Sequence, residues 1–236
     1  MVLLKSSFAD TYDLKKDYRL SIDLLGINLE IGTIDTYLEF NETDYKLNFN
    51  IKSNTLIGVV NKISGYGEIL GKIDDGSFIP VSYIYSYKRK NKNKKTEISF
   101  KNSNVTKSIT TPAFDKFKLT PIKSEMLNDV IDPVTSLIYI EDYELSNQCN
   151  RKYKIFDGKR RYNLSYVDKK INDNEIICSL ELSEIGGFKK IIKKDIFEPA
   201  RRIDVYYKII KNIISIDKII AKGQYSELII EVLIKS

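Results

Sequence analysis

The sequence contains no histidine and no tryptophan among its 236 residues. Histidine is the commonest general base and the commonest metal ligand, because its imidazole changes charge near neutral pH. Its absence excludes serine–histidine triads and cysteine–histidine dyads. A zinc site would have to combine the two cysteines with carboxylates, and their spacing does not suit one. We therefore expect no catalytic residues, no cofactor and no metal site.

Long apolar runs are also absent. A helix needs about 20 apolar residues to cross a bilayer, and no stretch provides them, so we expect no transmembrane span. The first residues, MVLLKSSFADTYDL, are typical of the end of a secretory signal, with Ser7 and Ala9 placed for cleavage before Asp10. The sequence predicts a residual signal-peptide-like segment at 1–9 and a single exported, β-rich domain at 10–236. The alternative is a disordered start of a soluble protein.

The charge balance is only mildly basic. Lysine and arginine number 38 against 32 acidic residues, which gives a net charge of +6 and a pI near 9.0. The densest basic run is KRKNKNKK, from Lys88 to Lys95. A nucleic-acid patch is one interpretation, but charge runs are usually solvated. We favour a hairpin loop there and expect no nucleic-acid partner.

Alternating apolar and polar residues dominate the chain. From Tyr18 to Ile51 the alternation runs through four segments, and Gly26 and Gly32, which separate the first three, indicate bulges or bends in long strands. Similar segments recur to the C-terminus, while Asn102 to Ser124 resembles an irregular crossing. This pattern predicts a mainly β protein of about ten strands, in a long, strongly curved antiparallel sheet that forms a half-barrel or open barrel.

Two short helices are expected beside the sheet. Leu56, Val59, Val60 and Ile63 recur at helical spacing, and Gly65 would end that helix. Asp132 would cap the second helix, with proline at its first position.

Tyrosines alternate along one predicted strand. Tyr83, Tyr85 and Tyr87 share a face with Val81. Such a stripe can stack bases or sugars. It is more often cross-strand packing with hydroxyl groups at the rim, which we favour while keeping these residues as candidate ligand contacts.

A hairpin between Cys149 and Val167 is the clearest local signal. Asp157-Gly158 favours a type I′ turn between two alternating strands. Arginines flank this turn and also begin a later strand. They are candidates for binding a phosphate or carboxylate headgroup or a protein partner. The simpler interpretation is that they are arginines on the solvent-exposed face of neighbouring strands. These arginines are Arg160, Arg161, Arg201 and Arg202.

The two cysteines lie at the start of this hairpin and on the next predicted strand. Cys149 and Cys178 are the only cysteines, so in an oxidising compartment they would pair with each other. The alternative is a pair of buried thiols that act as small apolar side chains.

Several of these segments together resemble an exported family of Gram-negative bacteria, domain of unknown function family 3108. The resemblance is carried by LLGINLEIG, DPVTSLIYI, Cys149, FDGKRRYNL, the Cys178 strand with IGGF, and EPARRIDVYY. It covers the chain from about Tyr18 onward. It implies a periplasmic, β-rich protein, an open half-barrel in shape, and it transfers no activity and no catalytic residue.

Three functions are compatible with these observations. A curved sheet with one apolar face must cover that face or leave a hydrophobic concavity. We therefore expect a non-enzymatic envelope protein that binds a lipid-like or acylated ligand. The alternative is a structural or protein-interaction module of the envelope with a self-filled core. The third is a hydrolase acting on envelope material, whose best catalytic candidates would be Asp157 and Asp132. A turn already explains the aspartate at 157, and a helix cap explains the one at 132.

Overall fold

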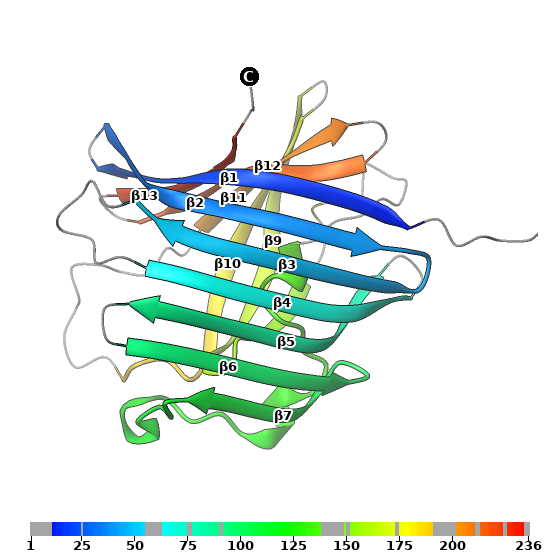
Figure 1. Cartoon of the computed structure of the whole chain (residues 1–236). Helices are drawn as coiled ribbons and strands as arrows, with labels where there is room; N and C mark the ends of the chain where they lie inside the picture. The colour runs from blue at the N-terminus through cyan, green and yellow to red at the C-terminus, as the bar shows by residue number, and fades with distance from the viewer. Residues whose placement is uncertain are drawn as a thin grey trace, which may run out of the picture.

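The computed structural model describes residues 11–24, 26–54, 63–74, 77–89, 92–137, 149, 152–172, 175–190, 202–210, 213–223 and 226–233. These residues form one antiparallel sheet of 13 strands (Figure 1). The strands are β1 Tyr12–Leu24, β2 Ile27–Phe40, β3 Asp44–Ser53, β4 Ile63–Asp74, β5 Ser77–Arg89, β6 Lys92–Lys101, β7 Asn104–Thr111, β8 Lys152–Phe156, β9 Arg161–Asn172, β10 Glu175–Gly186, β11 Arg202–Ile210, β12 Ile213–Lys222 and β13 Ser226–Val232. Three short 3-10 helices accompany them: η1 Lys116–Lys118, η2 Ser124–Leu127 and η3 Thr135–Leu137.

The sheet consists of two meanders that share one junction. Its order is β7-β6-β5-β4-β3-β2-β1-β13-β12-β11-β10-β9-β8, so the first and last strands of the chain pair at the centre. Among the described strands, β7 and β8 are the two edges and do not pair with each other. The prediction of a mainly β, antiparallel, open sheet is therefore confirmed, with thirteen strands where about ten were expected.

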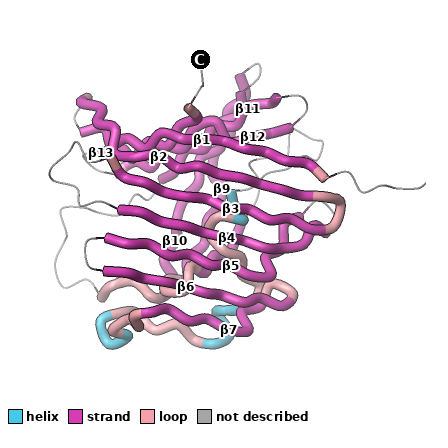
Figure 2. Tube along the Cα trace, in the orientation of Figure 1, coloured by secondary structure: helices cyan, strands magenta, loops and turns pink. Residues whose placement is uncertain are grey.

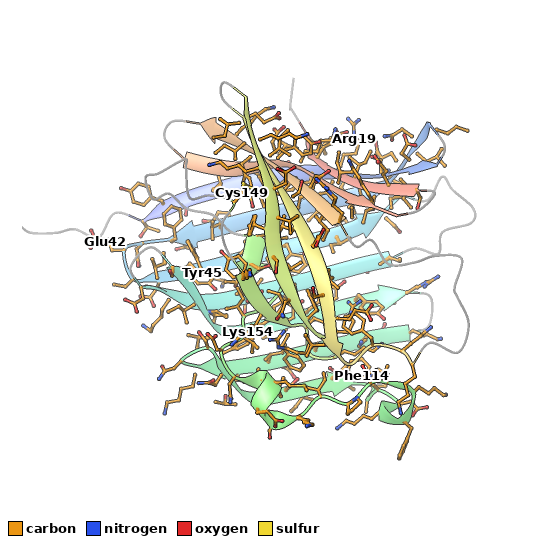
Figure 3. All side chains as sticks on the ribbon, turned by 180° about the vertical axis from the view of Figure 1, so that it is seen from behind. Arg19, Glu42, Tyr45, Phe114, Cys149 and Lys154 are labelled. Atoms are coloured by element: carbon orange, nitrogen blue, oxygen red, sulfur yellow. A yellow bond between two sulfur atoms is a disulfide. The ribbon has the colours of Figure 1, made fainter. Side chains whose placement is uncertain are left out.

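The curvature of the sheet brings its two ends face to face. Figure 1 shows β9 and β10 behind β2–β6 and steeply inclined to them. Figure 3, seen from behind, shows the yellow-green strands of this region crossing the sheet, with Cys149 on that side. The second meander thus lies over the concave face of the first, and this arrangement removes the apolar face of each from water.

The alternation of the sequence produces this one-sided burial. In β3, Tyr45, Leu47 and Phe49 are buried, whereas Asn50 is exposed and the intervening Lys46 and Asn48 are half-buried. Two clusters of buried side chains result. The first contains Leu38, Tyr45, Leu47, Phe49, Ile69, Tyr83, Ile98, Phe100, Val130 and Phe156. The second contains Cys149, Ile155, Tyr162, Leu164, Tyr166, Ile176, Cys178, Leu180, Val205 and Tyr207.

Val130 and Ile131, which lie between η2 and η3, link the β6–β7 turn to the edge strand β8. The Val130 amide donates to the carbonyl of Ser103, in the turn between β6 and β7, at 2.7 Å. The Ile131 amide donates to the Lys154 carbonyl of β8 at 2.9 Å, and the Phe156 amide donates to the Ile131 carbonyl at 3.0 Å. Part of the exposed edge of β8 is thereby satisfied, which limits its tendency to pair with other chains.

The two predicted helices are not present in the described residues, and Figure 2 shows only short helical turns. Residues 55–62 lie outside the described ranges, but Ile63 and Gly65, expected at the end of the first helix, lie inside β4. Hydrogen bonding to β3 and β5 on both sides decides the conformation there. After Asp132 the chain forms only the 3-10 turn η3, and residues 138–148 lie outside the description.

Several local predictions also need correction. Gly26 is not a bulge but the turn between β1 and β2, with φ of 86°, whereas a register shift does occur opposite Gly32. Residues 104–111, expected to be irregular, form β7, because they pair with β6. The basic run from Lys88 to Lys95 is largely strand, since only residues 90 and 91 separate the described ends of β5 and β6.

The hairpin between β8 and β9 is present, but its turn is shifted by one residue. The Asp157 amide donates to the Arg160 carbonyl at 3.1 Å, so Gly158 and Lys159 are the two central residues. Only Gly158 has a positive φ, of 86°. A type I′ turn needs positive φ at both positions, whereas a type II′ turn needs it only at the first. The Asp157 carboxylate instead stabilises the loop, because it accepts the amides of Lys159 and Arg160.

The disulfide between Cys149 and Cys178 is present. The Cα atoms are 5.3 Å apart, and both residues are buried in the second cluster. The bonded cysteines do not lie on neighbouring strands. Cys149 precedes β8, and β9 separates β8 from β10, which carries Cys178. The bond therefore crosses the packed face of the sheet and does not join adjacent paired strands.

We expect replacement of both cysteines by alanine to lower the free energy of unfolding by about 3–4 kcal/mol, because the bond closes a loop with a sequence separation of 29 residues. Urea unfolding of the double variant and of the oxidised wild type measures the difference. Dithiothreitol should destabilise the wild type and leave the variant unchanged. Equal stability of the two proteins would contradict a structural role for the bond.

Gly187 provides a test of how closely the chain packs around the hairpin turn. Its φ is 78°, and a Cβ there would collide with the Lys159 carbonyl oxygen. Gly26 is the matched control, because it has φ of 86° and open space around it. We expect Gly26→Ala to cost about 1–2 kcal/mol of left-handed strain. Gly187→Ala should cost about 1–3 kcal/mol more from overpacking. Similar midpoints of urea unfolding for the two variants would contradict this packing.

Candidate functional site

A pocket of about 350 Å³ lies on the concave face, between the two buried clusters. Its wall comes from β1, β2, β3 and β5 on one side, and from β12, β13 and the η3 segment on the other. Most lining side chains are aliphatic or aromatic. They are Leu14, Lys16, Tyr18, Ile34, Thr36, Leu38, Leu47, Phe49, Ile51, Tyr83, Tyr85, Val134, Leu137, Ile216, Ile219 and Ile230.

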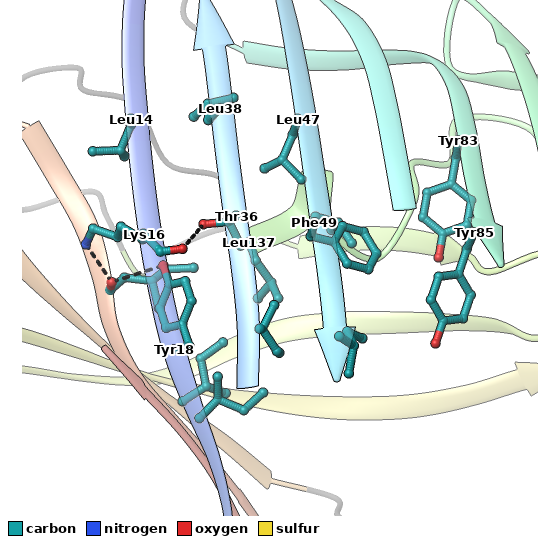
Figure 4. A pocket seen from close by; sticks show the side chains of 16 residues that line it. Leu14, Lys16, Tyr18, Thr36, Leu38, Leu47, Phe49, Tyr83, Tyr85 and Leu137 are labelled. Carbon is teal, nitrogen blue, oxygen red and sulfur yellow. Dashed lines mark hydrogen bonds between the residues drawn. The ribbon is translucent and has the colours of Figure 1, made fainter. Parts of the chain in front are cut away.

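The polar groups of the pocket are concentrated at its two ends. Figure 4 shows Lys16 and Tyr18 on one side, Tyr83 and Tyr85 on the other, and apolar side chains including Phe49 between them. Pockets that bind small molecules are typically apolar, with a few placed polar groups that set orientation. The distribution of polar groups along this pocket therefore suits an elongated molecule with an apolar body.

Asp132 fixes the segment that contributes Val134 and Leu137 to this wall. Its Oδ1 accepts the amides of Val134 and Thr135, each at 2.9 Å, and Oδ2 accepts the Thr135 hydroxyl. The Thr135 hydroxyl also lies 2.9 Å from the hydroxyl of Tyr45. Complete burial raises the pKa of the Asp132 carboxyl, and these hydrogen bonds only partly offset it. The cap expected of Asp132 is present, although it begins a 3-10 turn.

Lys16 is the one lysine among the pocket-lining residues of the described chain. Its ammonium donates to the carbonyl of Ile216 at 2.9 Å. The Tyr18 hydroxyl donates to the same oxygen at 3.5 Å, and the Thr36 hydroxyl donates to the Lys16 carbonyl at 3.0 Å. Burial lowers the pKa of Lys16; the charge of Asp217 opposes this, and the charge of Lys208 adds to it.

The predicted tyrosine stripe is divided between two sites. Tyr83 and Tyr85 line the apolar pocket, and burial raises the pKa of both phenols. Tyr87 lies in a second, more polar hollow lined by Lys52, Lys88, Lys94 and Lys95 among other residues. Val81, expected on the tyrosine face, is 44% exposed. A register shift between β4 and β5 beside Gly71 turns it outward.

The predicted arginines do not form one site. Arg160 pairs with Asp157 at 2.7 Å, and its side chain is 52% exposed. Arg161 is only 5% exposed, and its guanidinium donates to the Met126 carbonyl, the Tyr162 carbonyl and the Asn163 side chain. Arg201 lies outside the described residues. None of the described arginines lines the apolar pocket.

Arg202 belongs to a separate charged network on β9–β12. It donates to Ser179 at 2.8 Å and to Asp204 at 3.3 Å, while Lys222 pairs with Asp204 at 3.0 Å. Burial opposes ionisation of Asp204, but hydrogen bonds from Ser179, Lys222 and Arg202 outweigh it and lower the pKa of the carboxyl. The network gives the buried Asp204 carboxylate its hydrogen bonds and countercharges, which a buried charge needs. Its role in stabilising the fold is sufficient to explain this arrangement.

The hydrolase candidates are engaged in local structure. Asp157 accepts the amides of its own turn and pairs with Arg160, and Asp132 caps η3. Among the described residues, no group of three or more potential metal ligands occurs. In the same part of the chain, no helix is long and apolar enough to cross a membrane.

Lys16 and the pocket were missed by the sequence reasoning, although one signal pointed to Lys16. Tyr12, Leu14, Lys16, Tyr18 and Leu20 alternate in phase, so the lysine occurs where an apolar residue is expected. A charged residue on the buried face of a strand indicates either a salt bridge or a binding site. The rest of the pocket could not be anticipated, because its far wall comes from β12 and β13, about 200 residues later.

The fold and the pocket define an open antiparallel half-barrel protein with an apolar cavity on its concave face. The chain belongs to the family described as "Protein of unknown function (DUF3108)", whose model matches residues 17–175. No curated protein matches the sequence. Among solved structures, the chain is similar to a β-barrel-like protein of domain of unknown function DUF1849 from Brucella abortus. The two are 12% identical, with 93% of this chain and 95% of that chain covered and a TM-score of 0.47.

We expect Arg161→Ala to lower the free energy of unfolding by about 1–3 kcal/mol, because it leaves buried acceptors unpaired. Arg160→Ala is the matched control and should change stability by less than about 1 kcal/mol, since the Arg160 side chain is 52% exposed and the Asp157 carboxylate that it leaves still accepts the amides of Lys159 and Arg160. Thermal or urea unfolding of both variants measures the difference. Equal, small effects of the two substitutions would contradict a structural role for Arg161.

Proposed function

We propose that the protein is a non-enzymatic, exported envelope protein that binds the acyl chain of a lipid-like ligand in its concave pocket. The pocket itself carries the proposal: an apolar cavity of about 350 Å³ remains between two packed clusters. Apolar side chains that line an open pocket remain in contact with water, and removing them from water is favourable. A ligand with an apolar body would bury them.

The size of the pocket favours a ligand with one chain. Binding pockets span roughly 300–1,000 Å³, so this one is at the small end of the range. A single alkyl chain matches a mostly apolar cavity of this volume better than a bulky, multiply acylated lipid does. Aliphatic side chains such as Leu38, Leu47 and Ile230 offer no directional contacts, so they would tolerate variation in the chain.

The disulfide supports the exported location. Cys149 and Cys178 form a bond, and such bonds persist in the periplasm and outside cells but are rare in the cytosol. The signal-like residues 1–9 point the same way in the sequence.

The alternative is an interaction module of the envelope whose core needs no ligand. The observation in its favour is a set of exposed apolar residues, such as Leu70, Ile109 and Ile171. They are scattered over β4, β7 and β9, however, and single exposed apolar residues are normal on soluble proteins. We therefore prefer the ligand-binding proposal.

Mass spectrometry of organic extracts tests this proposal. Protein purified without detergent from its native compartment should yield one or a few acylated molecules in near-stoichiometric amounts. An equally treated protein of similar size provides the background. Absence of any enriched lipid, together with no binding of an added fatty acid in fluorescence titration, would favour the interaction module.

A substitution inside the pocket should separate binding from folding. Ile34→Trp places an indole in the cavity, and we expect it to weaken binding of the fluorescent fatty acid cis-parinaric acid at least tenfold. Leu70→Trp adds the same group on the outer face of β4, where Leu70 is 39% exposed, and should leave binding unchanged. Fluorescence titration measures both. Equal affinities of the two variants would place the ligand elsewhere.

A further inference from the structure

The ammonium of Lys16 is incompletely neutralised in an apolar surrounding. Within the described residues its hydrogen-bonding partner is the Ile216 carbonyl, at 2.9 Å, so one of its three N–H groups is used. Lys16 is half-buried, and its neighbours in the pocket include Leu14, Ile34 and Ile219. Burying a charge without a partner is costly, and most buried lysines are paired.

Asp217, the carboxylate whose charge favours the Lys16 ammonium, already has another partner. Asp217 pairs with Lys208 at 2.9 Å on the adjoining strands β11 and β12. Lys16 and Lys208 therefore share one carboxylate, which leaves the site with an excess of positive charge. The lowered pKa of Lys16 has the same cause, because burial and Lys208 disfavour the ammonium more than Asp217 favours it. A second anion beside Lys16 would relieve this imbalance.

We propose that Lys16 binds the anionic head of a single-chain amphiphile whose alkyl tail fills the apolar pocket. The inference rests on the proposed function and specifies its ligand class: a carboxylate or a phosphate monoester on one long chain. The Tyr18 hydroxyl lies at the same end. It has one proton, so it would donate to the head in place of its long, 3.5 Å contact with the Ile216 carbonyl. The tail extends between Leu38, Leu47 and Phe49 toward Tyr83 and Tyr85.

The excess of positive charge at Lys16 disfavours ligands with a cationic or a neutral head group. A quaternary ammonium would place a third cation beside Lys16 and Lys208. A neutral ester or alcohol would accept a hydrogen bond but would leave the charge of Lys16 uncompensated. A charge-assisted hydrogen bond to an anion is roughly twice as strong as a neutral one, and low local polarity strengthens it further.

The test compares an acid with its neutral analogue. Binding of cis-parinaric acid and of its methyl ester is titrated by fluorescence with the full-length protein and with Lys16→Met, Lys16→Arg and Lys46→Met. Lys46 is the matched control, because its side chain is 44% exposed and pairs with Glu68 outside the pocket. Thermal unfolding of each variant confirms that it folds.

The wild type should bind the acid at least tenfold more tightly than the ester. Lys16→Met should reduce that ratio to about one through weaker acid binding, Lys16→Arg should retain most of it, and Lys46→Met should leave it unchanged. Competition by dodecanoate and by dodecyl phosphate then distinguishes a carboxylate site from a phosphate site. If the wild type and Lys16→Met bind acid and ester equally, the inference is wrong although the pocket binds lipid. If the wild type binds neither probe, the proposed function itself fails.

Discussion

The antiparallel ladder between β1 and β13 is the interaction on which the rest of the structure depends. It pairs Tyr18 with Val232 and continues to Leu24 and Ser226, and it is the junction between the two meanders. Without it, β1–β7 and β8–β13 would be two sheets, each with an apolar face open to water. With it, the single sheet curves until the second meander covers the first (Figure 3).

The same ladder explains why the pocket lies where it does. Lys16 and Tyr18 come from β1, and Ile216 and Ile219 come from β12, one strand beyond β13. Farther away, the hairpin of β8 and β9 reaches β6, where the Gly158 turn lies against Thr96, and the layers pack closely. The pocket thus lies on the inner side of the bend in the sheet, beside the strands that join its two parts.

Buried polar groups stabilise the fold in two different ways. Asp132 is fully buried, and amide and hydroxyl donors from its own segment satisfy it, so it holds the η3 wall in place. Asp204 is nearly as buried, but it has Lys222 and Arg202 as countercharges. Lys16 has neither a carboxylate of its own nor a full set of acceptors. That difference is the physical basis for assigning it a ligand.

The sequence by itself determined the fold class, the disulfide pair and the buried face of most strands, because each depends on local alternation or on there being only two cysteines. It did not determine the conformation of residues 63–65 or 104–111, since pairing with neighbouring strands overrides local preference there. Nor could it show that Arg161 is buried or that Lys16 faces Ile216. Those positions follow from how distant strands approach one another, and only the tertiary structure decides that.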